Sequence, residues 1–146
     1  MAMDLNQYLN EILVALFQNI MDIEEKALIT EDFKDITIND MHVIEAVGIE
    51  EPRTMSSVAA TLSVTVGTLT TAINGLVNKG YVERLSSAKD RRVVLLRLTE
   101  RGTNAYNHHM DFHDNMIQSI LSELDQEERV VLSTTLLKLE KYLKDL

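Results

Sequence analysis

The sequence predicts a mainly α-helical fold with one small β-hairpin, in which long helices at both ends flank a compact middle segment. Apolar residues recur at spacings of three and four over most of the chain, which is the period of an amphipathic helix. Two short helical patterns between residues 55 and 79 are separated only by Ser63, Val64 and Thr65. Two strand-like runs follow, joined by a turn that contains Asp90-Arg91-Arg92.

The N-terminal part is expected to form a long helix, because its apolar residues share one face: Leu5, Leu9, Ile12, Leu16, Ile20 and Ile23. A second helix follows, with Thr37 or Asn39 as its N-cap and Met41, Ile44 and Val47 on its apolar face. Residues 50–54 are expected to be a break that contains the only proline, Pro52. Thr54 is suited to cap the next helix.

The middle segment has the layout of a helix-turn-helix followed by a hairpin. The first helix begins near Met55, and the second runs from Val66 to Lys79 and is ended by Gly80. In such a pair, the second helix enters the major groove of DNA, and Thr65 is its expected N-cap. The strands are expected at 81–85 and 93–98, and the basic turn between them forms a wing.

Two more helices are expected after the hairpin. Thr99 is suited to cap a helix over about residues 100–124, and Asp125 with Glu128 has the spacing of a capping box for the last helix. The terminal helices are too long to be buried in one small lobe, so we expect a symmetric dimer built from both chain ends. An intramolecular three-helix bundle is the alternative. The expected dimerisation region is 1–35 and 100–146, and residues 36–99 form the DNA-binding lobe.

Composition limits the class of protein. The chain has 146 residues, no cysteine and no apolar run long enough for a membrane span. Disulfides and thiol redox sensing are therefore excluded. The start Met1-Ala2-Met3-Asp4 lacks the basic and apolar regions of a secretory signal, so we expect a cytoplasmic protein without a membrane partner.

The charge is distributed unevenly along the chain. The net charge is −9, yet residues 53–104 contain eight basic and three acidic side chains. The rest of the chain contains six basic and twenty acidic residues. DNA binding needs local neutralisation of phosphates rather than a basic chain as a whole, so the middle segment is suited to DNA.

These motifs resemble the MarR family of bacterial winged-helix repressors. The resemblance rests on Leu62 to Thr65, on Leu76 to Gly80, and on Asp90-Arg91-Arg92 followed by Leu98-Thr99-Glu100-Arg101-Gly102. Within the family, the chain is most similar to the fatty-acid-synthesis repressors of streptococci and lactic acid bacteria. The narrower similarity rests on residues 41–45, 66–71 and 112–116.

The expected DNA-contacting residues come from both helices and from the wing. Small hydroxyl and amide side chains suit base edges, a glycine permits close approach, and a wing arginine suits a narrow A·T-rich minor groove. By the family's D-x-R pattern, Arg92 is the inserted residue and Asp90 orients it. The full expected set is Ser56, Ser57, Thr65, Gly67, Thr68, Thr71, Asn74, Lys79, Lys89, Asp90, Arg91 and Arg92. Two subunits would read an A·T-rich inverted repeat in double-stranded DNA.

The chain shows no catalytic set, so we assign no enzymatic activity and no required cofactor; control is expected to come from an effector. Resemblance to the fatty-acid-synthesis repressors implies a long-chain acyl–acyl carrier protein as co-repressor. A fatty chain needs an elongated apolar cavity. The expected wall residues are Leu13, Phe17, Phe33, Met41, Phe112 and Met116, although apolar residues of this kind are more commonly core.

Two alternatives to that reading remain open. His109 and His113 are one helical turn apart, a spacing that suits zinc, and a zinc-sensing branch of the same family uses Glu and His from comparable helices. The expected metal ligands are Glu24, His42, His109 and His113. The other alternative is an acidic winged-helix module that binds proteins and has lost DNA contact, against which the intact wing argues.

Overall fold

The computed structural model describes residues 4–28, 30 and 32–146. Two compact units make up the chain, residues 1–110 and 111–146. Residues 1–3, on which the expected lack of a secretory signal partly rests, lie outside the described residues. The predicted boundaries at residues 35/36 and 99/100 separate a dimerisation region from a DNA-binding lobe. They do not describe compact units, and they stay a prediction.

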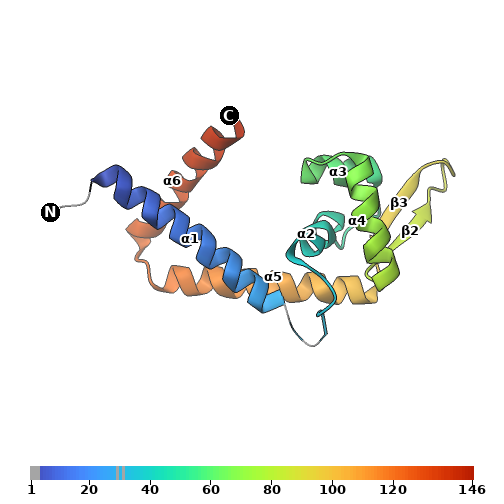
Figure 1. Ribbon diagram of the computed structural model, residues 1–146, viewed down its shortest axis with the longest axis horizontal. Coiled ribbons are helices and arrows are strands. Elements are labelled where there is room, and N and C mark those ends of the chain that lie inside the picture. Colours follow the sequence, from blue (N-terminus) through green and yellow to red (C-terminus); the bar gives the residue numbers. More distant parts are fainter. Residues whose placement is uncertain (1–3, 29, 31) are drawn as a thin grey trace. The chain divides into compact units, whose positions relative to one another are not determined.

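The first unit contains the helix-turn-helix and the hairpin (Figure 1). Its elements are α1 (Leu5–Leu28), α2 (Ile38–Val47), β1 (Arg53–Thr54), α3 (Met55–Leu62), α4 (Val66–Lys79), β2 (Val82–Ser86), β3 (Val94–Leu98) and the first part of α5 (Glu100–Ser122). The hairpin of β2 and β3 projects from the same end of the unit as α4. The mainly helical, winged fold that the sequence predicts is therefore confirmed.

Local side-chain caps explain where the helices of this unit begin. Thr37 Oγ1 accepts from the amide of Asp40 at 3.1 Å, and the Asp40 carboxylate accepts from the Thr37 amide at 3.1 Å. Of the two predicted caps for α2, Thr37 is the one used. Thr54 and Thr65 cap α3 and α4 in the same way, each accepting an amide three residues on at 3.1 Å. Each cap satisfies an amide that the helix itself leaves unpaired.

Two left-handed residues end the helices of the helix-turn-helix. Ser63 ends α3 at φ 56°, and Gly80 ends α4 at φ 86°. The Gly80 amide donates to carbonyls of the last turn of α4, and glycine adopts this conformation without steric cost. The tight turn after α3 and the sharp entry into β2 both follow from these two positions.

The sheet has three strands in the order β1-β3-β2, all antiparallel. The wing is formed by β2 and β3, in which Val82 pairs with Leu98 and Ser86 with Val94. The third strand corrects the sequence analysis, which expected residues 50–54 to be only a break. Arg53 and Thr54 pair with Leu96 and Leu95. A strand of two residues has no detectable period, and it exists only because β3 provides a distant partner.

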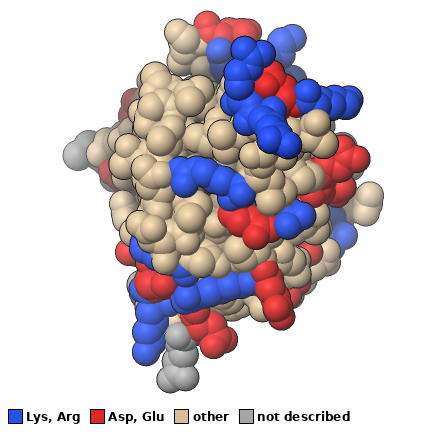
Figure 2. Space-filling view, turned by 90° about the vertical axis from the view of Figure 1, so that its right-hand side faces the viewer, with Lys and Arg blue, Asp and Glu red and all other residues tan. Residues whose placement is uncertain are grey.

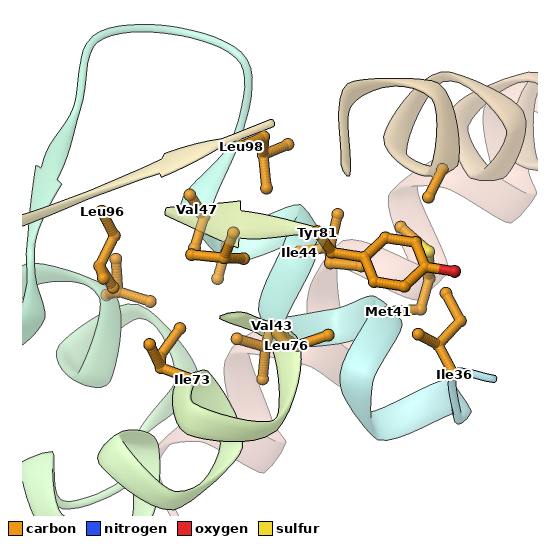
Figure 3. Close-up of a cluster of buried hydrophobic side chains, with 14 of the residues drawn as sticks. Ile36, Met41, Val43, Ile44, Val47, Ile73, Leu76, Tyr81, Leu96 and Leu98 are labelled. Carbon is orange, nitrogen blue, oxygen red and sulfur yellow. The ribbon is translucent and has the colours of Figure 1, made fainter. Parts of the chain in front are cut away.

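The core of the first unit lies between α2, α3, α4 and the sheet (Figure 3). Met41, Ile44, Ile73, Leu76 and Leu96 are all fully buried within it. The start of α5 packs on this core through its backbone: a Cβ added at Gly102 would lie 2.0 Å from the Tyr81 carbonyl oxygen. Only glycine fits there, so the backbone of α5 packs directly against the backbone at Tyr81, with no side chain between them.

The second unit comprises the rest of α5 and α6 (Gln126–Lys144). The predicted capping box is present: the Asp125 side chain accepts from the Glu128 amide at 2.8 Å, and Glu128 accepts from the Asp125 amide at 3.1 Å. The guanidinium of Arg129 donates to the carbonyls of Leu121 and Leu124, which closes the turn before α6. Along α6 no described residue is buried.

Both units expose large apolar faces. The exposed apolar side chains of α1 are Leu5, Tyr8, Leu9, Leu13, Val14, Leu16, Phe17, Ile20, Met21 and Ile23. On α6 they include Val130, Val131, Leu136, Leu137, Tyr142 and Leu143. Contiguous apolar surface of this extent on a globular protein marks an interaction site.

Within the described ranges, no single helix is long and apolar enough to cross a membrane. Helices α3 and α4 reach that length and apolar character only when taken together, and the pair is bent by 105° at the turn.

Candidate nucleic-acid interface

One face of α4 is a polar stripe exposed to solvent. Gly67, Thr71, Asn74 and Asn78 follow one another at helical spacing, and all four are exposed. The opposite face carries Leu69, Ile73 and Leu76, whose side chains are 1%, 0% and 0% exposed. The predicted inward face of this helix is therefore confirmed, and its small polar side chains face outward where a groove would be read.

The first turn of α4 presents backbone amides. The Thr65 side chain accepts from the amide of Thr68, and the amide of Leu69 donates to the Thr65 carbonyl. The amides of Val66 and Gly67 precede these bonds at an exposed helix N-terminus, where backbone N–H groups favour anions. At Gly67, a Cβ would meet nothing closer than Thr65 Oγ1 at 3.9 Å, so packing inside the chain does not require glycine there.

The first turn of α3 is organised by Arg53. Its Nη2 group donates to the Ser57 hydroxyl at 2.6 Å and to the Thr61 hydroxyl at 2.8 Å, and Nη1 donates to the Ala46 carbonyl. Arg53 therefore joins α2 to α3 and does not extend into solvent. Of the two serines predicted to contact phosphate, Ser56 is exposed, whereas Ser57 is half-buried and engaged by Arg53.

The wing tip carries the predicted aspartate–arginine pair. Arg92 Nε donates to Asp90 Oδ1 at 3.2 Å and Nη2 donates to Oδ2 at 3.3 Å, so both carboxylate oxygens hold one guanidinium. The Arg92 amide donates to the same carboxylate at 3.0 Å. The Arg92 hydrogen bonds, first from the side chain and then from the backbone, lower the pKa of Asp90. The Arg92 side chain is nevertheless 91% exposed, and Lys89 and Arg91 beside it are also exposed.

Other basic residues of the positive middle segment are bound by the chain itself. Lys79 Nζ lies 3.3 Å from Asp40, and Arg97 Nε donates to Glu83 at 2.6 Å. Arg84 Nη2 donates to the amide oxygen of Asn74, a contact between the wing and α4. Figure 2 shows this face, on which basic side chains gather toward the upper right and acidic side chains lie among them there and lower down.

A buried tyrosine links the end of α4 to the segment before α2. The Tyr81 hydroxyl donates to Asp35 at 2.6 Å, Arg101 Nη2 donates to the same carboxylate at 3.1 Å, and the Arg101 guanidinium lies 4.5 Å from the Tyr81 ring centroid. Burial, and then the bond to Asp35, raise the pKa of Tyr81 to about 12. Burial also acts to raise the pKa of Asp35, but hydrogen bonds from Tyr81 and the backbone, with the charge of Arg101, outweigh it and lower that pKa.

Three of the predicted metal ligands meet in the first unit, at the junction of α1, α2 and α5. Glu24 Oε1 lies 3.3 Å from His109 Nε2 and 3.6 Å from His42 Nε2. Glu45, which the predicted ligand set omits, places Oε2 3.6 Å from His109 Nε2. His109 is 2% exposed and Glu24 is 9% exposed, whereas the side chains of His42 and Glu45 are 47% and 44% exposed, so the group is buried on one side and open to solvent on the other. His113 belongs to the second unit, where its ring is tilted by 59° to that of Phe112 with the ring centroids 5.5 Å apart.

The predicted wall of an acyl pocket is not assembled within the first unit. Phe33 and Met41 are buried in the core, whereas Leu13 and Phe17 are 57% and 68% exposed on α1. Phe112 and Met116 belong to the second unit, and both are half-buried there. A groove of about 500 Å³ lies nearby on the first unit, lined by Met21, Glu25, Leu28, Lys34, Ile36, Thr37, Ile38 and Asn39. None of the expected wall residues lines it.

The expected DNA-contacting set does not include Arg84, which contacts the exposed stripe of α4 through Asn74. The alternation of β2 could have indicated this contact. Arg84 is two residues beyond the buried Val82, so both side chains lie on the sheet face that packs against α4. What no local pattern reveals is that its partner is Asn74, ten residues earlier on another element.

Known proteins with the same architecture include one solved on DNA. The sequence model described as MarR family matches residues 34–93. The crystal structure of Streptococcus pneumoniae FabT in complex with DNA superposes with a TM-score of 0.90 and is 41% identical, with 96% of this chain and 98% of that chain covered.

Curated bacterial relatives are more distant. The HTH-type transcriptional regulator SarZ of Staphylococcus saprophyticus is 30% identical over 104 residues, which cover 70% of this chain and 68% of SarZ. The uncharacterized HTH-type transcriptional regulator YhjH of Bacillus subtilis is 27% identical over 105 residues, 70% of this chain. The alignment with YhjH spans only 60% of that protein's length.

Proposed function

This chain belongs to the MarR family of DNA-binding transcriptional regulators, and from that premise we propose that it is a cytoplasmic homodimeric repressor that occupies an A·T-rich inverted repeat. The observation that carries the proposal is the pairing of two features on one end of the first unit. These are the exposed polar stripe of α4 and the exposed Arg92 held by Asp90. The likeness to a relative solved on DNA, at 41% identity over nearly the whole chain, supports the same reading.

The preference for A·T-rich sequence follows from what each element offers. The stripe of α4 from Gly67 to Asn78 carries no basic side chain, so base contacts rest on hydroxyl, amide and methyl groups. The tip of the wing carries three exposed cations, Lys89, Arg91 and Arg92. A narrow A·T-rich minor groove has enhanced negative potential and attracts arginine.

The exposed apolar faces support a second copy of this chain as the covering partner. Ten large apolar side chains of α1 and eight of α6 are exposed to solvent, which is more than isolated surface residues account for. A twofold dimer would bury equivalent faces of both chains and would place two wings to read an inverted repeat. If the protein sediments as a monomer, the result favours the alternative, a three-helix bundle formed within one chain.

The proposed targets are fatty-acid-synthesis genes, with long-chain acyl–acyl carrier protein as co-repressor. This part rests on the sequence resemblance to the fatty-acid-synthesis repressors of streptococci and lactic acid bacteria. The apolar side chains of Leu13 and Phe17 on α1 are suited to contact an acyl chain, but as exposed residues they serve a dimer equally well.

The proposal is tested by selecting bound fragments from random duplex DNA and from genomic DNA, with and without acyl carrier protein carrying a long acyl chain. We expect an A·T-rich inverted repeat with half-sites about one helical turn apart, and tighter binding when the acylated carrier is present. Unacylated carrier protein is the matched control. Binding without any sequence preference would contradict the repressor and favour the protein-interaction module.

A zinc-responsive regulator is a second candidate, favoured by the Glu24 group. Tetrahedral zinc with bonds of about 2.0–2.1 Å separates its ligand atoms by roughly 3.3 Å. The distances of 3.3 and 3.6 Å from Glu24 to the two histidines fit that separation. Two histidines and one carboxylate, with Glu45 beside them, are also donor types that zinc accepts. Ion pairs of protonated histidines with Glu24 give the same distances.

Zinc and simple ion pairing are distinguished by titration of the purified protein against a chromophoric zinc chelator. A zinc site predicts a dissociation constant below the micromolar range and a rise in melting temperature that His109→Gln and Glu24→Gln both abolish. His108→Gln is the matched control, because that ring contacts the Ala27 carbonyl at 3.0 Å. If the protein takes up no zinc, the zinc-responsive regulator is excluded and the acyl-regulated repressor remains the proposal.

A further inference from the structure

Arg84 and Asn74 connect the wing to the helix that faces DNA. Asn74 is exposed on the polar stripe of α4, two helical turns beyond Gly67. Arg84 is exposed on β2, and its Nη2 group donates to Asn74 Oδ1. Among the basic residues of the sheet, Arg97 is instead paired with Glu83, so the two exposed arginines of the sheet have different partners.

The chemistry of the guanidinium fixes which way the amide of Asn74 faces. A guanidinium has five N–H donors and no acceptor, so the amide atom that faces it is the oxygen. This assignment follows from the donor alone and needs no view of the hydrogens. With the oxygen turned toward β2, the NH₂ group of Asn74 is the part of the amide that remains for an outside partner.

An amide held in this way reads bases differently from a free one. A free asparagine recognises adenine with two bonds, donating to N7 and accepting from the N6 amino group. An asparagine that presents only its NH₂ group donates to any acceptor, which guanine, adenine and thymine all offer in the major groove. Cytosine offers only an amino donor there, so it is the base such a side chain disfavours.

We propose that Arg84 is a positioning residue that holds Asn74 as a hydrogen-bond donor, so that α4 rejects cytosine at one position of each half-site without selecting adenine. The inference rests on the proposed function, since it assumes that the stripe of α4 faces the major groove. It adds a source of sequence preference from a residue on the wing. The simplest competing role for Arg84 is a phosphate contact that raises affinity for every sequence alike.

The test compares base preferences rather than affinities alone. Selection from random DNA is carried out with the full-length wild type, Arg84→Ala, Asn74→Ala and the double variant. Arg97→Ala is the matched control, because it removes an exposed arginine from the same sheet without touching α4. Melting temperature establishes that each variant is folded, and the NMR signal of the Asn74 side-chain NH₂ group reports on its contact with Arg84 in the free protein.

We expect the wild type to deplete cytosine by about fivefold or more at one position per half-site. In Arg84→Ala, the freed amide can turn, and adenine becomes enriched at that position by a similar factor. The Arg84 effect disappears in the Asn74→Ala background, and Arg97→Ala keeps the wild-type preference. The Asn74 NH₂ signal shifts in Arg84→Ala and not in Arg97→Ala.

Two outcomes overturn the inference, and they are distinguishable. If Arg84→Ala weakens binding to all sequences equally and leaves the base preference unchanged, Arg84 is a phosphate contact only, and the proposed function stands. If the folded wild type binds no duplex, the proposed function fails and the inference falls with it.

Discussion

Asp90 holds the guanidinium of Arg92 through both carboxylate oxygens, at 3.2 and 3.3 Å, while the arginine side chain stays 91% exposed. An arginine at a loop tip normally samples many rotamers, and ordering it during binding costs conformational entropy. Here the bidentate pair and the backbone bond from the Arg92 amide restrict it beforehand. The wing therefore presents a guanidinium whose direction is set before any groove is entered.

The first prediction concerns this pair. Arg92→Ala should weaken specific DNA binding by roughly 1–3 kcal/mol, measured by fluorescence anisotropy on the selected operator. Asp90→Ala should cost less affinity than Arg92→Ala, because the guanidinium remains but is no longer oriented. Arg97→Ala serves as the control of equal charge. Unchanged binding by Arg92→Ala would contradict insertion of this residue.

The second prediction separates two glycines. Gly67→Ala should raise the free energy of unfolding by about 0.5–1 kcal/mol, because alanine favours helix and meets no close atom at this position. It should nevertheless weaken DNA binding, because the added methyl group stands between the helix and the groove. Gly102→Ala should destabilise the fold by about 1–3 kcal/mol, because its Cβ would overlap the Tyr81 carbonyl. Thermal melts and operator titrations of both variants test the contrast.

The third prediction is a loss of stability in alkali. The pKa of Tyr81 is raised from 10 to about 12, so the folded protein keeps the phenol neutral where the unfolded chain ionises. The stabilisation is fully present below pH 10 and is lost as the pH rises toward about 12. Denaturant unfolding of the wild type should show this decline, and Tyr81→Phe should show less of it. Tyr142→Phe, at an exposed tyrosine, should behave like the wild type.

The fourth prediction is a loss of stability in acid, caused by Asp35, which accepts hydrogen bonds from Tyr81 and Arg101. Its pKa is lowered, so its contribution to stability is present above the unfolded value and is lost as the pH falls through the folded value. Asp35→Asn should remove that acid-dependent part of the unfolding free energy. If Asp35→Asn and wild type lose stability in parallel as the pH falls, the carboxylate does not carry this dependence.

The fifth prediction tests the exposed faces of the terminal helices. Leu16→Glu on α1 and Leu143→Glu on α6 should each shift the protein toward monomer in sedimentation at micromolar concentration, because each places a charge on an exposed apolar face that the proposed dimer would bury. Asn10→Glu adds the same charge at a polar position of α1 and should stay dimeric. A wild type that is already monomeric would overturn the dimer.

Features set by neighbouring residues could be predicted from the sequence. The caps Thr37, Thr54 and Thr65, the capping box at Asp125 and the glycine that ends α4 all depend on contacts within four residues. The orientation of Arg92 by Asp90 is implied by the resemblance to the family's D-x-R pattern, and it too is a local contact, since the two residues are only two positions apart. Local patterns suffice where the partners are local.

Features set by distant partners could not be predicted in this way. The eight basic residues of the middle segment form one class in the sequence, but Lys79 is paired with Asp40 across 39 residues and Arg101 with Asp35 across 66. Strand β1 exists only through its pairing with β3. The apolar residues expected to line one pocket are divided between the core and an exposed face, because periodicity alone does not distinguish a cavity wall from packing.

The internal pairing of half these cations limits how many counterions the protein can release from DNA. Arg53, Lys79, Arg97 and Arg101 are engaged within the chain away from the wing tip. Lys89, Arg91 and Arg92 are exposed at that tip, with Asp90 beside Arg92, and Arg84 is exposed on β2, where its partner is the uncharged amide of Asn74. For a dimer, the slope of log affinity against log salt should then be about −7 instead of about −14 for all eight. Much of the binding free energy is then expected from contacts within the grooves. These contacts depend on base sequence, whereas attraction to the phosphates does not.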